Sequence, residues 1–288
     1  MLNHRWPDFF IVGAPRTGTT SLQNYFEEIP DIFMCPKESG YFSKLSPGPT
    51  ISEENYFNSF KIASDKQLIG DATAIYLRDS ETPKLIHGTN PDSKIIILLR
   101  DPIERAFSHY LMYLRDGYES DTFSNKLKDF ISKKPTTGNF YNYIIMPSFY
   151  HESIIRYLNI FGEKNVRIWI YEEFSANTPK IVQEILDFLG VLGFMPKNVG
   201  KKYNEYGKPL GETSRSIVEN TTIKNIAKRF LPKSKRTSLQ KTVFNQKGQK
   251  PVLCENDIRI LQDLFQDDVI KLKKLLNRNL NWTHFPEN

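Results

Sequence analysis

The chain has 288 residues, of which 39% are hydrophobic and 13% aromatic, and its formal net charge at pH 7 is +6. This length suits one α/β domain spanning residues 1–288, and the apolar content excludes a chain that is disordered throughout. The longest aliphatic run, residues 95–99, is far too short to cross a bilayer.

Apolar periodicity predicts strands and helices in alternation along the chain. We expect strands at residues 8–12, 31–34, 67–73, 93–99 and 165–171. We expect helices at residues 18–29, 53–60, 80–91, 102–115, 147–161, 178–190 and 255–276, and irregular chain at 116–147 and 197–250. The five consecutive aliphatic residues 95–99 suit a central parallel strand. The alternation predicts an α/β fold in three layers, with a parallel sheet covered by helices on both faces.

Positive charge is concentrated in residues 197–250, which hold 14 lysines and arginines against three acidic residues, a local net charge of +11. Because the total is +6, the rest of the chain sums to −5. Such a segment is either a solvated, mobile surface insertion or a binding surface for an anionic partner. A nucleic-acid-binding protein is one interpretation, but the segment lacks a zinc-finger or RNA-recognition signature. We therefore expect no nucleic-acid partner.

The stretch GAPRTGTT, residues 13–20, follows the first predicted strand and opens the first predicted helix. Glycines at this spacing let backbone N–H groups turn toward a phosphate, and the helix N-terminus adds partial positive charge. A loop of this kind that binds ATP or GTP carries a lysine where this chain has Thr19, and here the positive charge stands earlier, at Arg16. A P-loop nucleoside-phosphate kinase or GTPase, the alternative from another class, would use Asp101 to hold magnesium. Arg100 separates that acid from its strand and is better suited to grip a phosphate.

Two further stretches, PKESGYF at 36–42 and RDPIERAFSHY at 100–110, follow predicted strands at the sheet edge where α/β proteins bind ligands. Together with PRTGTTS at 15–21, they resemble PAPS-dependent sulfotransferases, where PAPS is 3′-phosphoadenosine 5′-phosphosulfate. The resemblance covers most of the chain, including FGEKNVRIWIYEEF, FLGV and the C-terminal helix. It is closest to bacterial members related to glycan (heparan-type) enzymes. It implies a P-loop-NTPase-like sulfotransferase fold, PAPS as co-substrate and no metal.

The resemblance also implies which residues hold the nucleotide. The 5′-phosphosulfate would be bound by the backbone and hydroxyls of the first loop, namely Arg16, Thr17, Gly18, Thr19, Thr20 and Ser21. Arg100 and Ser108 would hold the 3′-phosphate, and Tyr203 and Lys208 would close over the nucleotide. Arg16 would also stabilise the phosphate that departs when the S–O bond breaks, because its charge grows in the transition state.

Glu38 matches the catalytic base of glycan-type members, and Lys37 precedes it as in those enzymes. A histidine and a lysine that glycan-type members often carry are replaced here by Gly40 and Ala72. We therefore expect in-line transfer to a hydroxyl or amine of a small metabolite or natural product, with a glycan acceptor as the alternative. The base would reach the phosphate loop if the first two strands were neighbours. His151, at the start of a predicted helix, is the stronger rival for the base.

Other features of the chain bear on its surroundings and on the remaining histidine candidate. His109 follows Ser108 on a helix, so we expect it to point away from the phosphate and to pack. Cys35 and Cys254 lack ligand spacing and are typical of reduced thiols, and the N-terminus lacks the apolar segment of a signal peptide. We expect a cytoplasmic protein whose partner is a small-molecule acceptor and not a membrane.

Overall fold

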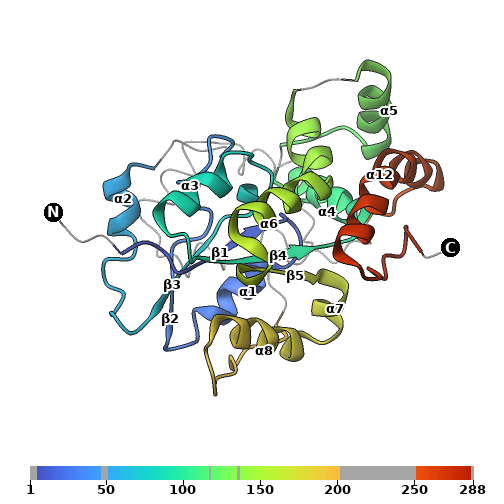
Figure 1. The fold of residues 1–288 in the computed structure, drawn as a ribbon. Helices are drawn as coiled ribbons and strands as arrows, with labels where there is room; N and C mark the ends of the chain where they lie inside the picture. The colour runs from blue at the N-terminus through green and yellow to red at the C-terminus, as the bar shows by residue number, and fades with distance from the viewer. Residues whose placement is uncertain (1–4, 47–50, 117, 135–136, 202–250, 287–288) are drawn as a thin grey trace.

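The computed structural model describes residues 5–46, 51–116, 118–134, 137–201 and 251–286 (Figure 1). Its centre is a sheet of five strands in the order β2-β3-β1-β4-β5, and every neighbouring pair is parallel. The strands are β1 (Phe9–Gly13), β2 (Ile32–Met34), β3 (Leu68–Ala72), β4 (Lys94–Leu99) and β5 (Val166–Ile170). The predicted α/β class with a parallel sheet is confirmed.

Helices and short turns fill the connections between and after the strands. The α-helices are α1 (Thr19–Phe26), α2 (Glu53–Asn58), α3 (Thr82–Thr89), α4 (Pro102–Arg115), α5 (Phe123–Lys133), α6 (His151–Asn165), α7 (Tyr171–Ala176), α8 (Thr178–Leu189) and α12 (Glu255–Leu276). The short turns are η1 (Ala74–Leu77), the π-helical η2 (Phe140–Ile145) and η3 (Met146–Ser148). Among the described residues, no helix is long and apolar enough to span a membrane.

Two hydrophobic cores lie on opposite faces of the sheet, because successive strand residues point to opposite sides. On β1, Phe10 and Val12 belong to the core under α3, α4, α6 and α12, whereas Phe9 and Ile11 belong to the core over α1 and α8. Figure 1 shows the same arrangement, with α1, α7 and α8 on one side of the strands and α3, α4 and α6 on the other. The three layers leave the carboxyl ends of the strands as the edge at which loops can form a site.

The structure corrects two expectations. The stretch 116–147 is not irregular, since it contains α5, η2 and the beginning of η3. Phe123, Leu127, Phe130 and Ile131 of α5 recur at helical spacing, so the helical pattern was present in the sequence and the expectation of irregular chain was wrong. The first two strands are not neighbours, because the two edges of β1 are taken by β3 and β4.

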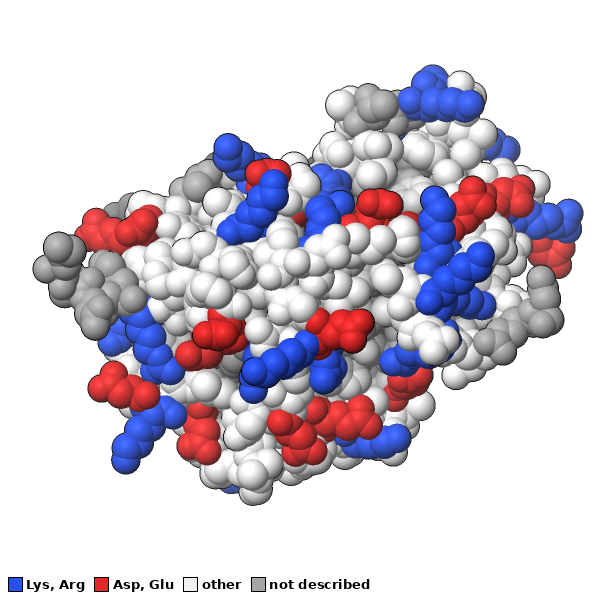
Figure 2. All heavy atoms as spheres, viewed as in Figure 1, with Lys and Arg blue, Asp and Glu red and all other residues white. Residues whose placement is uncertain are grey.

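The charged side chains on the face drawn in Figure 2 are mixed in sign. Lysines and arginines alternate there with aspartates and glutamates over the described elements, without a continuous basic field. This mixture agrees with a chain whose positive charge is concentrated in residues 197–250. Most of that segment, including Tyr203 and Lys208, lies outside the described residues.

Candidate active site

The loop between β1 and α1 ends in a left-handed turn at Gly18, directly before the helix. Gly18 precedes the helix with φ of +92°, and a Cβ there would lie 2.8 Å from the Phe174 ring, so only glycine fits. The Thr17 hydroxyl donates to the carbonyl of Ala14 over 2.6 Å and closes the loop on itself. The first turn of α1 has no acidic residue and no side-chain cap, so its N–H groups and partial positive charge are available to an anion.

A cluster of arginines faces this loop from β4 and α4. Arg16 donates from Nε to the Ser108 hydroxyl over 3.3 Å, and Arg100 donates from Nη1 to the Arg16 carbonyl over 3.4 Å. Burial, followed by the nearby guanidinium groups of Arg115 and Arg100, lowers the pKa of Arg16 to about 10. The three predicted residues Arg16, Arg100 and Ser108 are therefore brought together around an electropositive point.

Arg100 is held in place but keeps an unused donor. Its Nη2 pairs with Glu104 over 3.0 Å, and its guanidinium lies 4.7 Å from the centre of the Tyr171 ring. The Tyr150 hydroxyl donates to the Arg100 carbonyl over 3.0 Å. The buried Nε of Arg100 has no hydrogen-bond partner within the described part of the chain. A buried donor of this kind is satisfied by an oxyanion bound beside it.

Asp101, the acid that a kinase would use for magnesium, is committed to the fold. It is 1% exposed and caps α4 by accepting from the N–H groups of Ile103 and Glu104. Its other oxygen accepts from the N–H of His284 over 3.0 Å. Burial raises the pKa of Asp101 above its ordinary value. Both carboxylate oxygens are thus engaged inside the protein, and the kinase interpretation loses its metal ligand.

Glu38 lies beside the phosphate loop although β3 separates the first two strands. Its main-chain N–H donates to the Ala72 carbonyl at the end of β3, over 3.0 Å, so the loop crosses the end of that strand. The carboxylate accepts from the Ala74 N–H over 3.0 Å and pairs with Lys37 over 3.3 Å. Lys37 also donates to the Thr19 hydroxyl over 3.3 Å, which joins the Glu38 loop to the start of α1.

Arg16 and Glu38 share an unusual backbone conformation. Their φ angles are +72° and +57°, in the left-handed region that side chains other than asparagine and aspartate rarely adopt. Of the other non-glycine residues with positive φ in the described chain, Lys134 and Asn277 end helices, where this conformation is ordinary, and Asn281 is an asparagine. Strain of this kind is concentrated at functional sites. It marks the two residues that the sequence assigns to catalysis.

Asp71, at the end of β3, fixes the loop that carries Glu38, and it was not among the site residues expected from the sequence. This fully buried carboxylate accepts from the hydroxyls of Ser39, Tyr56 and Thr73, each over 2.8 Å. Burial raises its pKa, and these hydrogen bonds oppose the increase. Ser39 follows Glu38 directly, so the network fixes the loop that carries the candidate base. An aspartate inside an apolar strand was the available signal.

The two histidine candidates occupy different positions. His109 is buried, its Nδ1 lies 3.2 Å from Arg105 Nη1, and burial holds its pKa well below the ordinary value. His151 begins α6, and its main-chain N–H donates to Asp268 of α12 over 3.2 Å. Its imidazole Nδ1 lies 3.4 Å from Glu152, so its described contacts face α12 and its own helix.

Thr20 and Ser21, two of the residues expected to hold the nucleotide, lie in the first turn of α1.

The fold and its loops together define an α/β protein in which arginines gather beside a glycine loop that opens the first helix. Residues 6–274 match the model of the sulfotransferase domain family, and the chain belongs to that family. The resemblance read from its motifs is thereby confirmed.

Individual relatives agree with this assignment. A sulfotransferase crystal structure from Alicyclobacillus acidocaldarius is 26% identical, with a TM-score of 0.72 over 96% of this chain and 98% of that one. The human bifunctional heparan sulfate N-deacetylase/N-sulfotransferase 3 is 25% identical over 95% of this chain and 30% of its own length. Mouse sulfotransferase SULT7A1 has been crystallised with PAP (adenosine 3′,5′-bisphosphate). It is 18% identical to this chain, with a TM-score of 0.52 over 96% of this chain and 90% of that one, and it shows the same fold. The chain spans less than half the length of the curated relatives it matches.

Proposed function

We propose that the protein transfers the sulfuryl group of PAPS to a hydroxyl or amine of a small acceptor. The observation that carries the proposal is the contact of Arg16 with Ser108 and Arg100 beside an uncapped helix N-terminus, with Lys37 and Glu38 adjoining it. A nucleotide with phosphate at both its 3′ and 5′ positions needs two such anion sites. The Arg100 and Ser108 side chains supply one, and the loop N–H groups of α1 supply the other.

The residues present fit PAPS, which supplies a sulfuryl group attached to a phosphate leaving group. The unused Nε of Arg100 would take a 3′-phosphate oxygen, and the N–H groups after Gly18 would take the 5′ end. A mouse sulfotransferase with the same fold is described with PAP bound, which agrees with this fit.

Catalysis follows from the charges that these residues carry. Glu38, held by the Ala74 N–H, accepts the proton as the acceptor O–H or N–H bond breaks. The acceptor atom bonds to sulfur while the S–O bond to phosphate breaks, giving sulfated acceptor and adenosine 3′,5′-bisphosphate (PAP). Arg16 stabilises the negative charge that grows on the departing phosphate oxygen. Lys37, between Glu38 and Thr19, keeps positive charge beside the reacting centre.

Two departures from the glycan-type pattern support a small metabolite or natural product over a glycan. Gly40 has a φ of +69°, and a Cβ there would lie 2.4 Å from the Ser46 hydroxyl, so a histidine would be strained at this position. Ala72 is fully buried at the end of β3 and supplies no side-chain cation there. A glycan acceptor remains the alternative, because the heparan-modifying relative matches 95% of this chain.

A panel assay tests the function. The protein is incubated with PAPS and small phenols, alcohols, amines and oligosaccharides, and products are analysed by mass spectrometry. A gain of one SO₃ group on an acceptor, matched by released PAP, supports the proposal. PAP binding without transfer to any member of the panel leaves the nucleotide assignment intact but rejects these acceptor classes.

A further inference from the structure

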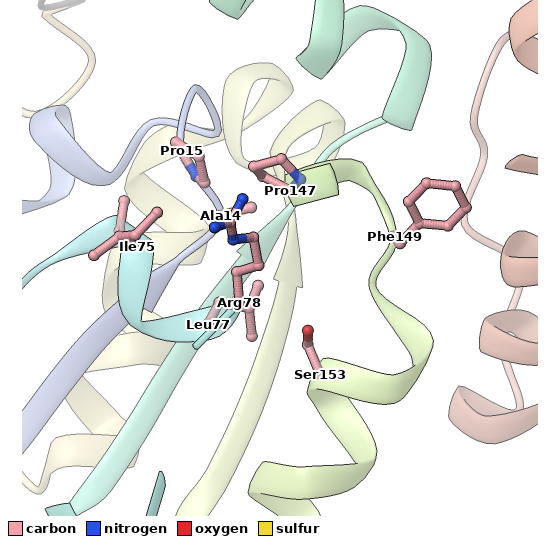
Figure 3. A pocket seen from close by; sticks show the side chains of 9 residues that line it. Ala14, Pro15, Ile75, Leu77, Arg78, Pro147, Phe149 and Ser153 are labelled. Carbon is pink, nitrogen blue, oxygen red and sulfur yellow. The ribbon is translucent and has the colours of Figure 1, made fainter. Parts of the chain in front are cut away.

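A hollow opens beside the phosphate loop, on the side of the sheet that carries α6. It is lined by Ala14 and Pro15 of that loop, by η1 with Arg78, and by Pro147 and Ser153 (Figure 3). Its cavity volume is about 10 Å³, so it is a shallow notch with room for about one water molecule, and a larger group can sit only at its mouth. Figure 3 shows the Arg78 side chain extending from the end of η1 toward Ala14 and facing Pro147.

The hollow lies next to the phosphate loop and next to the segment that holds Glu38. Ala74, which also lines it, donates its N–H to the Glu38 carboxylate over 3.0 Å. A Cβ on Gly13 would lie 2.6 Å from the Ala74 carbonyl oxygen, so the phosphate loop and η1 touch at this point. An acceptor that presents its hydroxyl to Glu38 would therefore extend its neighbouring groups toward the hollow.

Arg78 is a half-buried cation without a carboxylate partner among the described residues. Its guanidinium donates to the main-chain carbonyl of Asn142 in η2, which is a neutral acceptor. The carboxylate of the adjacent Asp79 is already engaged, by the Ser43 hydroxyl over 2.6 Å and by the Glu81 N–H over 3.0 Å. Burial lowers the pKa of Arg78, and the nearby Tyr143, Asp79 and Tyr141 oppose the decrease only in part.

A second arginine, Arg156, contacts two residues that line the hollow. Arg156 donates from Nη2 to the Ser153 hydroxyl over 3.0 Å and to the Arg78 carbonyl over 3.3 Å. Its buried Nε has no hydrogen-bond partner within the described part of the chain. A buried guanidinium donor without a partner is costly unless an acceptor binds beside it. Arginine also matches the planar geometry of carboxylate and the oxygens of sulfate or phosphate.

We propose that Arg78 selects the acceptor, and that the acceptor carries a carboxylate, sulfate or phosphate close to the hydroxyl or amine that receives the sulfuryl group. This assignment rests on the proposed sulfotransferase function and names its substrate class. The anion binds to the Arg78 guanidinium at the mouth of the hollow. The acceptor then extends from Arg78 past Ala74 to Glu38, which takes the proton of its hydroxyl or amine.

Matched pairs of probes test the assignment, since the members of each pair differ at a single group, a carboxylate in one and a neutral amide or hydroxymethyl group in the other. We would use 4-hydroxyphenylacetate against 4-hydroxyphenylacetamide, and methyl β-glucuronide against methyl β-glucoside. The wild-type protein should prefer the acid of at least one pair by about 10- to 100-fold in kcat/KM, the range of a charge-assisted hydrogen bond. The pair with the larger preference distinguishes an aromatic acid from a sugar acid.

Three variants separate Arg78 from general effects of charge. Arg78→Gln should remove the preference by lowering turnover of the acid alone, with unchanged affinity for PAP. Arg78→Lys should restore part of it, because the charge remains without the planar fork. Arg259→Gln removes a positive charge from an exposed position on α12 and should behave as the wild type.

A probe that is not turned over is measured by its binding to PAP-saturated protein in a calorimeter. Equal binding and turnover of acid and neutral members by the wild type would overturn the assignment, even if a variant failed to fold. An acid preference that survives in Arg78→Gln would overturn it as well. Failure of the underlying function is recognised separately, by the lack of any PAP binding in the wild type.

Discussion

The Nε of Arg16 donates to the hydroxyl of Ser108 over 3.3 Å, which joins the loop after β1 to the second turn of α4. The contact places the cation of the phosphate loop and a predicted 3′-phosphate ligand in one cluster. Arg100 completes it through the Arg16 carbonyl. Guanidinium groups held this close repel one another, so the cluster is built in advance for a polyanion.

Replacing Arg100 with alanine should weaken PAP binding by about 2–4 kcal/mol, the scale of a lost charge-assisted contact. Affinity for adenosine 5′-phosphosulfate, which lacks the 3′-phosphate, should hardly change. Calorimetric titration of both ligands measures the difference. Equal losses for the two would remove Arg100 from the 3′-phosphate site.

Glu38→Gln keeps the shape of the side chain and removes the proton acceptor. Because general-base catalysis contributes typically about 10²–10⁴-fold, kcat should fall by that range while PAP affinity stays unchanged. The matched control is His151→Ala, since His151 contacts Asp268 and Glu152 and should leave kcat near the wild-type value. Normal turnover in Glu38→Gln together with a collapse in His151→Ala would transfer the role of base to the histidine.

Gly18→Ala should destabilise the loop that precedes α1. The φ of +92° is strained for alanine, and the added Cβ would meet the Phe174 ring at 2.8 Å. We expect a loss of about 1–3 kcal/mol in the free energy of unfolding, together with weaker PAP binding. Gly138→Ala, at a positive φ with open space around the new Cβ, controls for backbone strain alone. Identical behaviour of the two variants toward PAP would contradict the role of the Gly18 turn.

His284, which follows α12 in the chain, should make stability depend on pH. A hydrogen bond to Glu104 raises its pKa, helped by the charges of Asp101 and Glu104 and opposed by burial. Because the folded pKa lies above the unfolded value of about 6.5, its stabilisation is fully present below that pH and is lost as the pH rises through the folded pKa. The wild type should exceed His284→Gln in unfolding free energy by more at pH 5.5 than at pH 9. Denaturant unfolding at both pH values measures this, and a larger difference at pH 9 would reverse the sign.

The sequence could predict the strands and the phosphate loop because both depend on local patterns. The aliphatic run of β4 is buried on both faces, and Gly18 stands where the helix begins. The order of the strands could not be predicted, since β3 enters between β1 and β2 through pairing that no local pattern encodes. Helix α5 differs from this case, because its apolar residues do recur at helical spacing and a closer reading of the sequence would have predicted it.

Part of the candidate site depends on contacts between distant segments. The stacking of Tyr171 on Arg100 joins residues at the ends of β5 and β4, and the Asp71 network draws its hydroxyls from separate elements. The sequence did not single out Arg78, because its position beside the phosphate loop follows only from the placement of η1. Resemblance to a family supplied the roles of Arg16, Glu38 and Ser108, and the fold supplied their surroundings.

Sulfuryl transfer itself is tested most directly by product analysis in excess chelator. The protein is incubated with PAPS, the acceptor panel and EDTA, and PAP and sulfated product are quantified together. The account predicts that both form in equal amounts and that magnesium changes neither, since Arg16, Arg100 and the start of α1 supply the positive charge. Consumption of ATP with a strict magnesium requirement, and no PAP formed from any acceptor, would contradict it.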